Sequence, residues 1–481
     1  MTRQLSVASV GSVRRPVRSI GVLVVALLLA AFASSDAAQQ KQLPPTPGAP
    51  KNFTLPAPTR FTLQNGLPVT MVAFGHVPKV SVRLVVEAGN VYETANQVWL
   101  ADVMGRMLQE GTVALTADAL ARELAGMGGE LSVGVGPDRA SIGTDLLSEH
   151  GARAVQLVAD VARHPQLPGD ALARVKASLA RDLAIQKTQP QSVAQEKFSA
   201  FVYGDHPYGR IFPTDAMLDS YTLDDVRAFH RQHFGANRAR LYIAGVFDAA
   251  AMEQAVRQAF GDWTASDRTT AAAVTREAHK HFAMLDRADA PQSTIFLGLR
   301  VPDPSQADWV ALQVTDALLG GAFASRITSN IREQKGYTYS PNSSVNSHRR
   351  DANWVEVADV TTAVTGPALK EIFAEIDRLR REAPPSDELQ GIKNSLAGVF
   401  VVQNASRSSL ISQLAFVDLH GLGEDYLTKY VERVNAVTAE DVRRIAHDYL
   451  TPETMTLVVV GDAKAIKEQV APWSQGVTEQ Q

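Results

Sequence analysis

Two side chains in the stretch from Gly320 to Ser340 are suited to stabilise negative charge on an oxygen atom. Arg332 carries a guanidinium that stays protonated at physiological pH, and Tyr339 carries a phenol that donates a hydrogen bond. Such donors stabilise a peptide carbonyl, or the oxyanion that forms when that carbonyl is attacked. The spacing alone leaves a second interpretation open, in which Arg332 only caps a helix and Tyr339 packs in a core.

Two elements must position this pair. Apolar residues recur at helical intervals up to Ile331, and Gly336 is a typical helix stop. The three residues after Gly336 alternate like the start of a strand. We therefore expect Arg332, on the last helical turn, and Tyr339, on the strand, to face the same cleft.

The chain begins with the layout of a secretory signal peptide. Three arginines precede an apolar run over residues 20–33, and small residues follow as far as Ala38. The run is too short to span a bilayer comfortably. We therefore exclude residues 1–38 from the fold and expect a periplasmic protein with no stable membrane insertion. An uncleaved membrane anchor is the alternative.

Composition excludes several classes of function. The chain has no cysteine, so thiolate chemistry and disulfide bonds are impossible. Its formal net charge of −4 argues against nucleic acid as a partner. With 45% hydrophobic residues over 481 positions, the chain can bury the cores of two domains.

The order of patterns predicts a mixed α and β protein. Prolines mark residues 39–58 as an extended leader. A tight two-residue hairpin turn is expected at Asn65-Gly66, because these residues accept positive backbone dihedrals. Further elements are expected as a strand over 80–88, helices over 97–109, 116–127, 149–162 and 169–203, and strands over 130–135 and 140–147.

An internal repeat relates the two halves of the chain. A capped helix that begins at Thr222 and a buried strand that ends at Gly245 match a helix that begins at Thr438 and a strand that ends at Gly461. Both matches have an offset of 216 residues, which makes duplication a better explanation than chance. The predicted boundaries are an N-terminal domain over 59–264, a linker over 265–276 and a C-terminal domain over 277–476.

A helix over residues 99–112 carries unusual residues on its polar side. Asp102, Gly105 and Arg106 share this side, opposite an apolar face. The segment resembles the helix that carries the inverted zinc motif His-x-x-Glu-His in the insulinase, pitrilysin and mitochondrial-processing-peptidase family. Glu93, upstream of the helix, fits the same frame.

This resemblance places residues of the chain where the zinc site of the family would be. Asp102 and Arg106 stand at the two His positions, Gly105 at the general-base Glu, and Asp182 at the third ligand. Arg106 cannot lose its proton, so its charge opposes a metal ion. Without a carboxylate at Gly105, no group of the motif can activate a metal-bound water. We therefore expect no zinc in this chain, and an i, i+4 ion pair between Asp102 and Arg106.

The resemblance covers nearly all of the chain after the leader. Gly320-Gly321 looks like the short glycine loop of the family. Arg332 and Tyr339 match, at the same spacing of seven, an Arg and Tyr pair that contacts bound peptide and steadies the tetrahedral intermediate. The family fold implies an α+β protein of two similar α/β-roll domains, each with a mixed, largely antiparallel sheet covered by helices.

The histidines are expected to have structural roles. His206 corresponds to a loop residue in the family. His230 and His233 sit at i, i+3 on one helix and could share a metal ion. The repeat copy has Ala446 and Tyr449 at these places, which favours packing.

In two-chain bacterial members of this family, one subunit carries zinc and the other carries the Arg and Tyr pair. The resemblance therefore implies the non-catalytic subunit of an exported heteromeric zinc peptidase that acts on peptides or unfolded polypeptides. Zinc is then expected in a paralogous partner subunit. Two alternatives stay open: a peptidase-derived binding or scaffolding protein, and a free-standing hydrolase with a displaced site.

Overall fold

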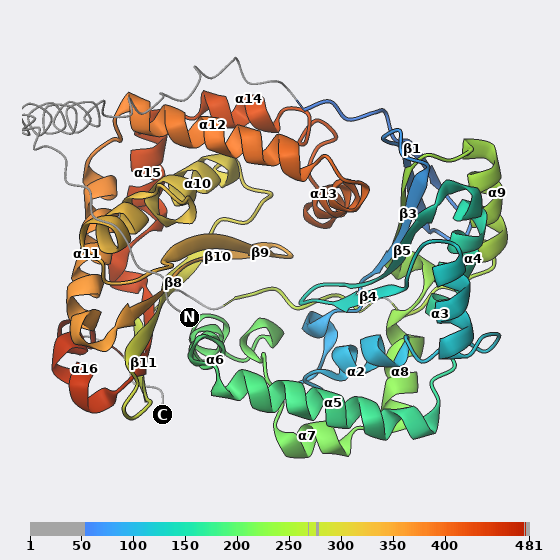
Figure 1. Ribbon diagram of the computed structural model, residues 1–481, viewed down its shortest axis with the longest axis horizontal. Coiled ribbons are helices and arrows are strands. Elements are labelled where there is room, and N and C mark those ends of the chain that lie inside the picture. Colours follow the sequence, from blue (N-terminus) through green and yellow to red (C-terminus); the bar gives the residue numbers. More distant parts are fainter. Residues whose placement is uncertain (1–52, 268, 276–278, 476, 478–481) are drawn as a thin grey trace, which may run out of the picture. The chain divides into compact units, whose positions relative to one another are not determined.

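The computed structural model describes residues 53–267, 269–275, 279–475 and 477. The predicted signal segment and most of the proline-rich leader lie outside these residues. In the described part, no helix combines the length and the apolar character that crossing a membrane requires. The described chain forms two mixed sheets, each with helices packed against it, so the predicted α+β class is confirmed (Figure 1).

The first sheet consists of strands from residues 59–245. They are β1 (Thr59–Thr62), β2 (Pro68–Ala73), β3 (Lys79–Val86), β4 (Ser132–Val135), β5 (Ala140–Leu147) and β6 (Ala239–Gly245). The order across the sheet is β1-β2-β6-β3-β5-β4. β2 and β6 run parallel, whereas the other neighbours run antiparallel. β4 is therefore an edge strand, and it lies next to the helix with the unusual polar side.

The helices of the first half lie around this sheet and its β4 end, except for the helix over residues 190–203, which packs against the second sheet. They are α2 (Leu100–Met107), α3 (Ala117–Gly126), α4 (Gly151–Arg163), α5 (Gly169–Thr188), α6 (Pro190–Tyr203), α7 (Asp215–Ser220), α8 (Leu223–His233) and α9 (Ala249–Phe260). α4 and α9 pack together over one face of the sheet (Figure 1). α2 packs against α5 and α8 and buries Val103, Met104 and Met107 completely. The apolar stripe of α2 thus fixes which way its polar side points.

The second sheet has strands β7 (His281–Asp286), β8 (Gln292–Val301), β9 (Asn342–His348), β10 (Asp351–Thr361) and β11 (Thr456–Gly461), in the order β7-β11-β8-β10-β9. The helices of the second half are α10 (Trp309–Asp316), α11 (Thr365–Arg381), α12 (Ser386–Gln403), α13 (Arg407–His420), α14 (Tyr430–Ala436), α15 (Ala439–Tyr449) and α16 (Ala463–Val470). α10 continues into a π-helical turn over Ala317–Gly321, and a second π-helical segment covers Thr328–Gln334.

The two copies of the sequence repeat occupy the same place in the two sheets. Thr222 and Thr438 each form a capping box, with Asp225 and Asp441 respectively. The strands that follow, β6 and β11, each run parallel to one neighbour and antiparallel to the other. The repeat seen in the sequence is therefore a repeat of topology as well.

Two local predictions are wrong. The helix expected over 169–203 is two helices, α5 and α6, which meet at Gln189 because the residue before Pro190 avoids helical geometry. The hairpin between β1 and β2 is present, but its loop is wider than two residues. The backbone N–H of Leu63 donates to the carbonyl oxygen of Leu67 at 2.9 Å, which closes a three-residue loop, and both leucines are buried in the core.

The two halves contact each other through α6, α13 and the turn between β9 and β10. Phe198 on α6 packs against Phe296 of β8, with ring centroids 6.2 Å apart. α13 lies against β3 and β6. The backbone N–H of Arg349, in the turn, donates to the carboxylate of Asp138 at 3.3 Å. These contacts bring side chains of the second half close to the polar side of α2.

Candidate functional site

A buried carboxyl group fixes the start of α2. Trp99, immediately before the helix, has a left-handed backbone with φ 71°. Glu93 is 6% exposed and accepts hydrogen bonds from the backbone N–H groups of Trp99 (3.1 Å) and Ala101 (2.7 Å). These groups would otherwise lack partners at a helix start. Burial raises the pKa of Glu93 to about 8, so this carboxyl is largely protonated at neutral pH.

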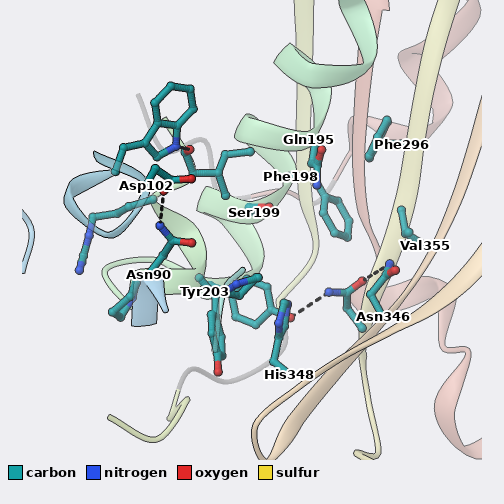
Figure 2. A pocket seen from close by; sticks show the side chains of 17 residues that line it. Asn90, Asp102, Gln195, Phe198, Ser199, Tyr203, Phe296, Asn346, His348 and Val355 are labelled. Atoms are coloured by element: carbon teal, nitrogen blue, oxygen red, sulfur yellow. Dashed lines mark hydrogen bonds between the residues drawn. The ribbon is translucent and has the colours of Figure 1, made fainter. Parts of the chain in front are cut away.

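Asn90 connects Glu93 to the first of the predicted metal-site positions. Its Nδ2 donates to Oδ2 of Asp102 at 2.8 Å (Figure 2) and to Oε1 of Glu93 at 3.3 Å. Burial raises the pKa of Asp102, and the hydrogen bond from Asn90 opposes this rise. Asn90 is missed by sequence reasoning, because no residue spacing identifies it. Glu93 is indicated only because it fits the frame of the family motif.

Arg106 pairs with Asp182 on the neighbouring helix. Nη2 of Arg106 lies 3.3 Å from Oδ2 of Asp182, across the contact between α2 and α5. The predicted i, i+4 pair of Arg106 with Asp102 is therefore wrong, because Asn90 engages Asp102 and Asp182 is within reach of Arg106. The two paired side chains are 52% and 42% exposed. A pair so accessible to water contributes at most about 1 kcal/mol.

Gly105 faces the edge strand at very short range. A Cβ atom at this position would lie 2.6 Å from Cγ2 of Val135 on β4. Real Cβ atoms do not approach other heavy atoms so closely, so any larger residue at Gly105 requires Val135 to move. The place where a general-base side chain would project is thus filled by the edge strand, a feature that sequence spacing does not reveal.

These four positions do not fit a zinc ion. Zinc takes imidazole, thiolate or carboxylate ligands. Here one carboxylate, Asp102, is held by Asn90, and the other, Asp182, is bonded to the guanidinium of Arg106. Across the described ranges, no three His, Asp or Glu side chains gather as a metal site requires. The polar side of α2 can therefore bind other groups through charge and hydrogen bonds.

A cavity of about 350 Å³ opens beside Asp102 (Figure 2). Trp99, Phe198 and Tyr203 line it from the first half, and Phe296 and His348 line it from the second half. Most of the other lining groups are apolar side chains or neutral amides. The predicted position Asp102 is thus part of a cavity that both halves build, which the sequence could not indicate.

Arg332 lies in the second half, on the predicted helix. This helix ends before Gly336, as predicted, and the backbone φ of Gly336 is 65°. Its last part is π-helical, an irregularity that is often found at functional sites. Nε of Arg332 donates to Oε1 of Glu333 at 2.7 Å, and the guanidinium carbon lies 3.9 Å from the centre of the Phe323 ring. The guanidinium is therefore held from two sides.

Tyr339 is 87% exposed, so the interpretation that it packs in a core is wrong. The predicted strand start is wrong as well, because only Thr338 forms an isolated bridge and regular pairing of β9 begins at Asn342. Tyr339 nevertheless lines the same surface hollow as Arg332, together with Phe323. Arg332 on its helix and Tyr339 on the irregular segment after it thus line one hollow.

The three histidines considered as ligands make structural contacts. Nε2 of His230 lies 2.8 Å from the carbonyl oxygen of Ala162, and Nε2 of His206 lies 3.0 Å from that of Ala272. His233 is buried, and its burial lowers its pKa to about 4. Burial lowers the pKa of the other two as well. The contact of His230 and the burial of His233 agree with the packing role expected from the repeat, and the contact of His206 agrees with its expected structural role.

Two family descriptions match the chain one after the other. Residues 72–214 match the family described as insulinase, peptidase family M16. Residues 220–396 match the family described as peptidase M16 inactive domain. The first match contains α2 and α5, and the second contains the hollow with Arg332 and Tyr339.

Similar proteins extend over most of the chain. An uncharacterised zinc protease of Mycobacterium leprae is 26% identical over 403 residues, 81% of this chain and 89% of that protein. One of Bacillus subtilis is 23% identical over 397 residues, 82% and 96% of the two chains.

Among solved structures, a protease from Helicobacter pylori matches with a TM-score of 0.79 at 19% identity, over 85% of this chain and 100% of that one. A peptidase M16 inactive domain from Pseudomonas fluorescens matches with a TM-score of 0.77 at 23% identity, over 84% and 98%. At such identities these two matches show the shared fold alone.

Proposed function

Because this chain belongs to the M16 (insulinase) family of peptidases, we propose that it is the non-catalytic subunit of an exported, heteromeric zinc peptidase. In this proposal a paralogous partner subunit holds the zinc, and the substrate is a peptide or an unfolded polypeptide. The chain contributes substrate binding and transition-state stabilisation through Arg332 and Tyr339. Removal of the signal segment leaves it in the periplasm without stable membrane insertion.

The observation that carries the proposal is the placement of Arg332 and Tyr339 in one surface hollow. Phe323 and Glu333 hold the guanidinium, while the phenol is open to solvent. Donors fixed before a reaction stabilise charge that develops on a substrate oxygen. Since Gly105 supplies no base, the attacking water has to be activated by another chain.

A second candidate is a binding protein with no proteolytic role. The cavity beside Asp102 favours it, because apolar walls with a few polar groups are typical of ligand sites. The two candidates differ in whether a zinc-bearing partner exists.

The first experiment recovers the tagged chain from its native host together with the proteins it binds. We expect a paralogue with an intact His-x-x-Glu-His motif, zinc in the complex, and peptide cleavage that a chelator abolishes. The chain alone is expected to bind no stoichiometric zinc and to cleave no peptide. One zinc per isolated chain, with chelator-sensitive cleavage, would overturn the proposal.

The second experiment measures turnover of the complex with Arg332→Ala or Tyr339→Phe. Each change is expected to lower turnover about 10²- to 10³-fold, the usual effect of losing one oxyanion donor. Assembly should be unaffected, because both side chains can be shortened without opening a core. Matched controls are Arg381→Ala, at the exposed end of α11, and Tyr337→Phe, two residues before Tyr339. Wild-type turnover in both test variants would contradict the assigned role.

A further inference from the structure

We propose that the cavity beside Asp102 is a binding site of its own, for an aromatic residue at the free amino terminus of a peptide. The cavity shares no lining residue with the hollow that contains Arg332 and Tyr339. The inference therefore goes beyond the proposed function and does not require a proteolytic partner.

Aromatic rings form most of the apolar wall of the cavity. Trp99, Phe198, Tyr203, Tyr208 and Phe296 all line it. The rings also hold one another, since Tyr203 and Tyr208 meet edge to face with centroids 5.6 Å apart. A space of about 350 Å³ between fixed rings suits one further ring, which gains from edge-to-face and offset contacts.

Asp102 supplies the negative charge. It is the one carboxylate among the described residues that line the cavity. Arg210, the one guanidinium in this lining, donates to backbone carbonyls, among them that of Glu93 at 3.4 Å. Arg106, one turn after Asp102, is paired with Asp182. Neither guanidinium group is hydrogen-bonded to Asp102, although the charge of Arg106 acts on it, so the carboxylate of Asp102 can still attract the ammonium group of a ligand.

Of the two neighbouring carboxyl groups, Asp102 is the one that can carry this charge. Burial raises the pKa of Glu93 to about 8, so it adds little negative charge at neutral pH. Burial also raises the pKa of Asp102. An ammonium group beside Asp102 would favour its ionised form, which couples ligand binding to this one carboxylate.

Gln195 and Ser199 supply hydrogen-bonding groups for a peptide bond. They are one turn apart on α6, and both line the cavity beside Phe198 (Figure 2). Neither side chain makes a hydrogen bond to another described residue. A carboxamide and a hydroxyl can each donate and accept, as the N–H and C=O of a peptide require. The cavity therefore matches an amino-terminal aromatic residue: its rings suit the side chain, Asp102 suits the ammonium group, and Gln195 and Ser199 suit the peptide bond.

The test is calorimetric titration of the full, purified chain with three probes: Phe-Gly-Gly amide, its N-acetyl form, and phenethylamine. The free-amine peptide is expected to bind. Acetylation should weaken binding about 10- to 100-fold, because it removes one charge-assisted hydrogen bond. Phenethylamine should bind more weakly than the peptide, because it has no peptide bond for Gln195 and Ser199.

Variants assign the effect to the cavity. Asp102→Asn should weaken the free-amine peptide to the level of the acetylated one, whereas Phe198→Ala should weaken both. Asp170→Asn, at the exposed start of α5, is the matched control, because it removes a carboxylate that does not line the cavity and leaves the Arg106–Asp182 pair in place. The thermal midpoint of each variant checks that it is folded. The comparison of the three probes on the unmodified chain needs no variant and stands even if one fails to fold.

Several results would overturn the inference. They are no binding of the free-amine peptide at millimolar concentration, equal binding of the free and acetylated peptides, and unchanged binding by Asp102→Asn. Phenethylamine binding as tightly as the peptide would also overturn it, since the site would then read a free amine and not a peptide terminus. No turnover enters this measurement, so its failure and that of the proposed function are separate outcomes.

Discussion

The central regions of the two sheets differ at one equivalent position. Ile142 on β5 pairs with Leu84 of β3, and Glu356 on β10 pairs with Leu297 of β8. Leu84 pairs in turn with Leu241 of β6, and Leu297 pairs with Leu457 of β11. Leu241 and Leu457 are equivalent positions of the sequence repeat. Ile142 and Glu356 are both 0% exposed. The same place in the fold thus holds an alkyl group in one half and a carboxyl group in the other.

The surroundings of Glu356 show how the second half accommodates this carboxyl. Neither of its oxygens has a hydrogen-bond partner among the described residues. Burial and, after it, the charge of Asp316 raise the pKa of Glu356 well above its usual range, which favours its neutral form. A Cβ atom on Gly320 would lie 2.6 Å from Oε2 of Glu356. The repeat therefore preserves the backbone while the second half places an acid under its glycine loop.

The largest effect is expected from placing the same acid in the first half. Ile142→Glu should lower the free energy of unfolding by about 3 to 5 kcal/mol, because it buries a carboxyl without a partner among apolar side chains. Ile142→Val, the control, should cost only about 0.5 to 1.5 kcal/mol. Urea-unfolding midpoints followed by circular dichroism measure both. A wild-type midpoint for Ile142→Glu would show that the two sheets tolerate acids equally.

Removing the acid from the second half should stabilise the protein. Glu356→Leu is expected to raise the free energy of unfolding by about 1 to 3 kcal/mol near pH 8, because a polar group without a partner is no longer buried. The gain should shrink toward pH 5. A carboxyl with a raised pKa in the folded state binds more protons there than in the unfolded state, so wild-type stability falls as pH rises.

The pH dependence separates protonation from shape. Glu356→Gln keeps the shape of the side chain and removes its titration, so it should lose the part of the pH slope that Glu356 causes. Unfolding midpoints at pH 5, 7 and 8 provide the comparison. Identical slopes for wild type and Glu356→Gln would mean that Glu356 does not bind a proton in the folded protein.

The glycine loop should respond to overpacking. Gly320→Ala is expected to cost about 1 to 3 kcal/mol, since its methyl group would meet Oγ of Ser343 and Oε2 of Glu356. Gly391→Ala, in α12 with no atom within 4 Å of its Cβ position, should instead gain about 0.5 to 1 kcal/mol. Thermal midpoints test the pair. Combining Gly320→Ala with Glu356→Ala should recover part of the loss, and simple additivity would argue against contact between them.

The smallest effect concerns the degenerate metal positions. Arg106→Ala and Asp182→Ala should each change the free energy of unfolding by less than about 1 kcal/mol, because their ion pair is about half exposed. A double-mutant cycle at low and high salt measures their coupling. A coupling above this range that persists in high salt would mean that the pair is shielded from water, in contrast to its exposure here.

The sequence by itself determined those features that depend on residues close along the chain. The capping boxes of Thr222 and Thr438, the apolar stripe of α2 and the stop at Gly336 all arise within a few residues of backbone. The repeat then predicted two similar sheets, because equal local patterns fold into equal elements. The resemblance to a known family located Asp102, Gly105, Arg106 and Asp182 on the two helices that the structure brings into contact.

Only the tertiary structure decided which of these groups meet. Asp102 bonds to Asn90, and Arg106 to Asp182, because folding packs α2 against the segment before it and against α5. The cavity beside Asp102 exists because β8 and β9 of the second half come close to α6. The raised pKa of Glu356 follows from its complete burial beneath the glycine loop. The burial of a side chain, its hydrogen-bond partners and the walls of a cavity depend on residues far apart in the chain. A local sequence pattern contains information only about residues that are close along the chain.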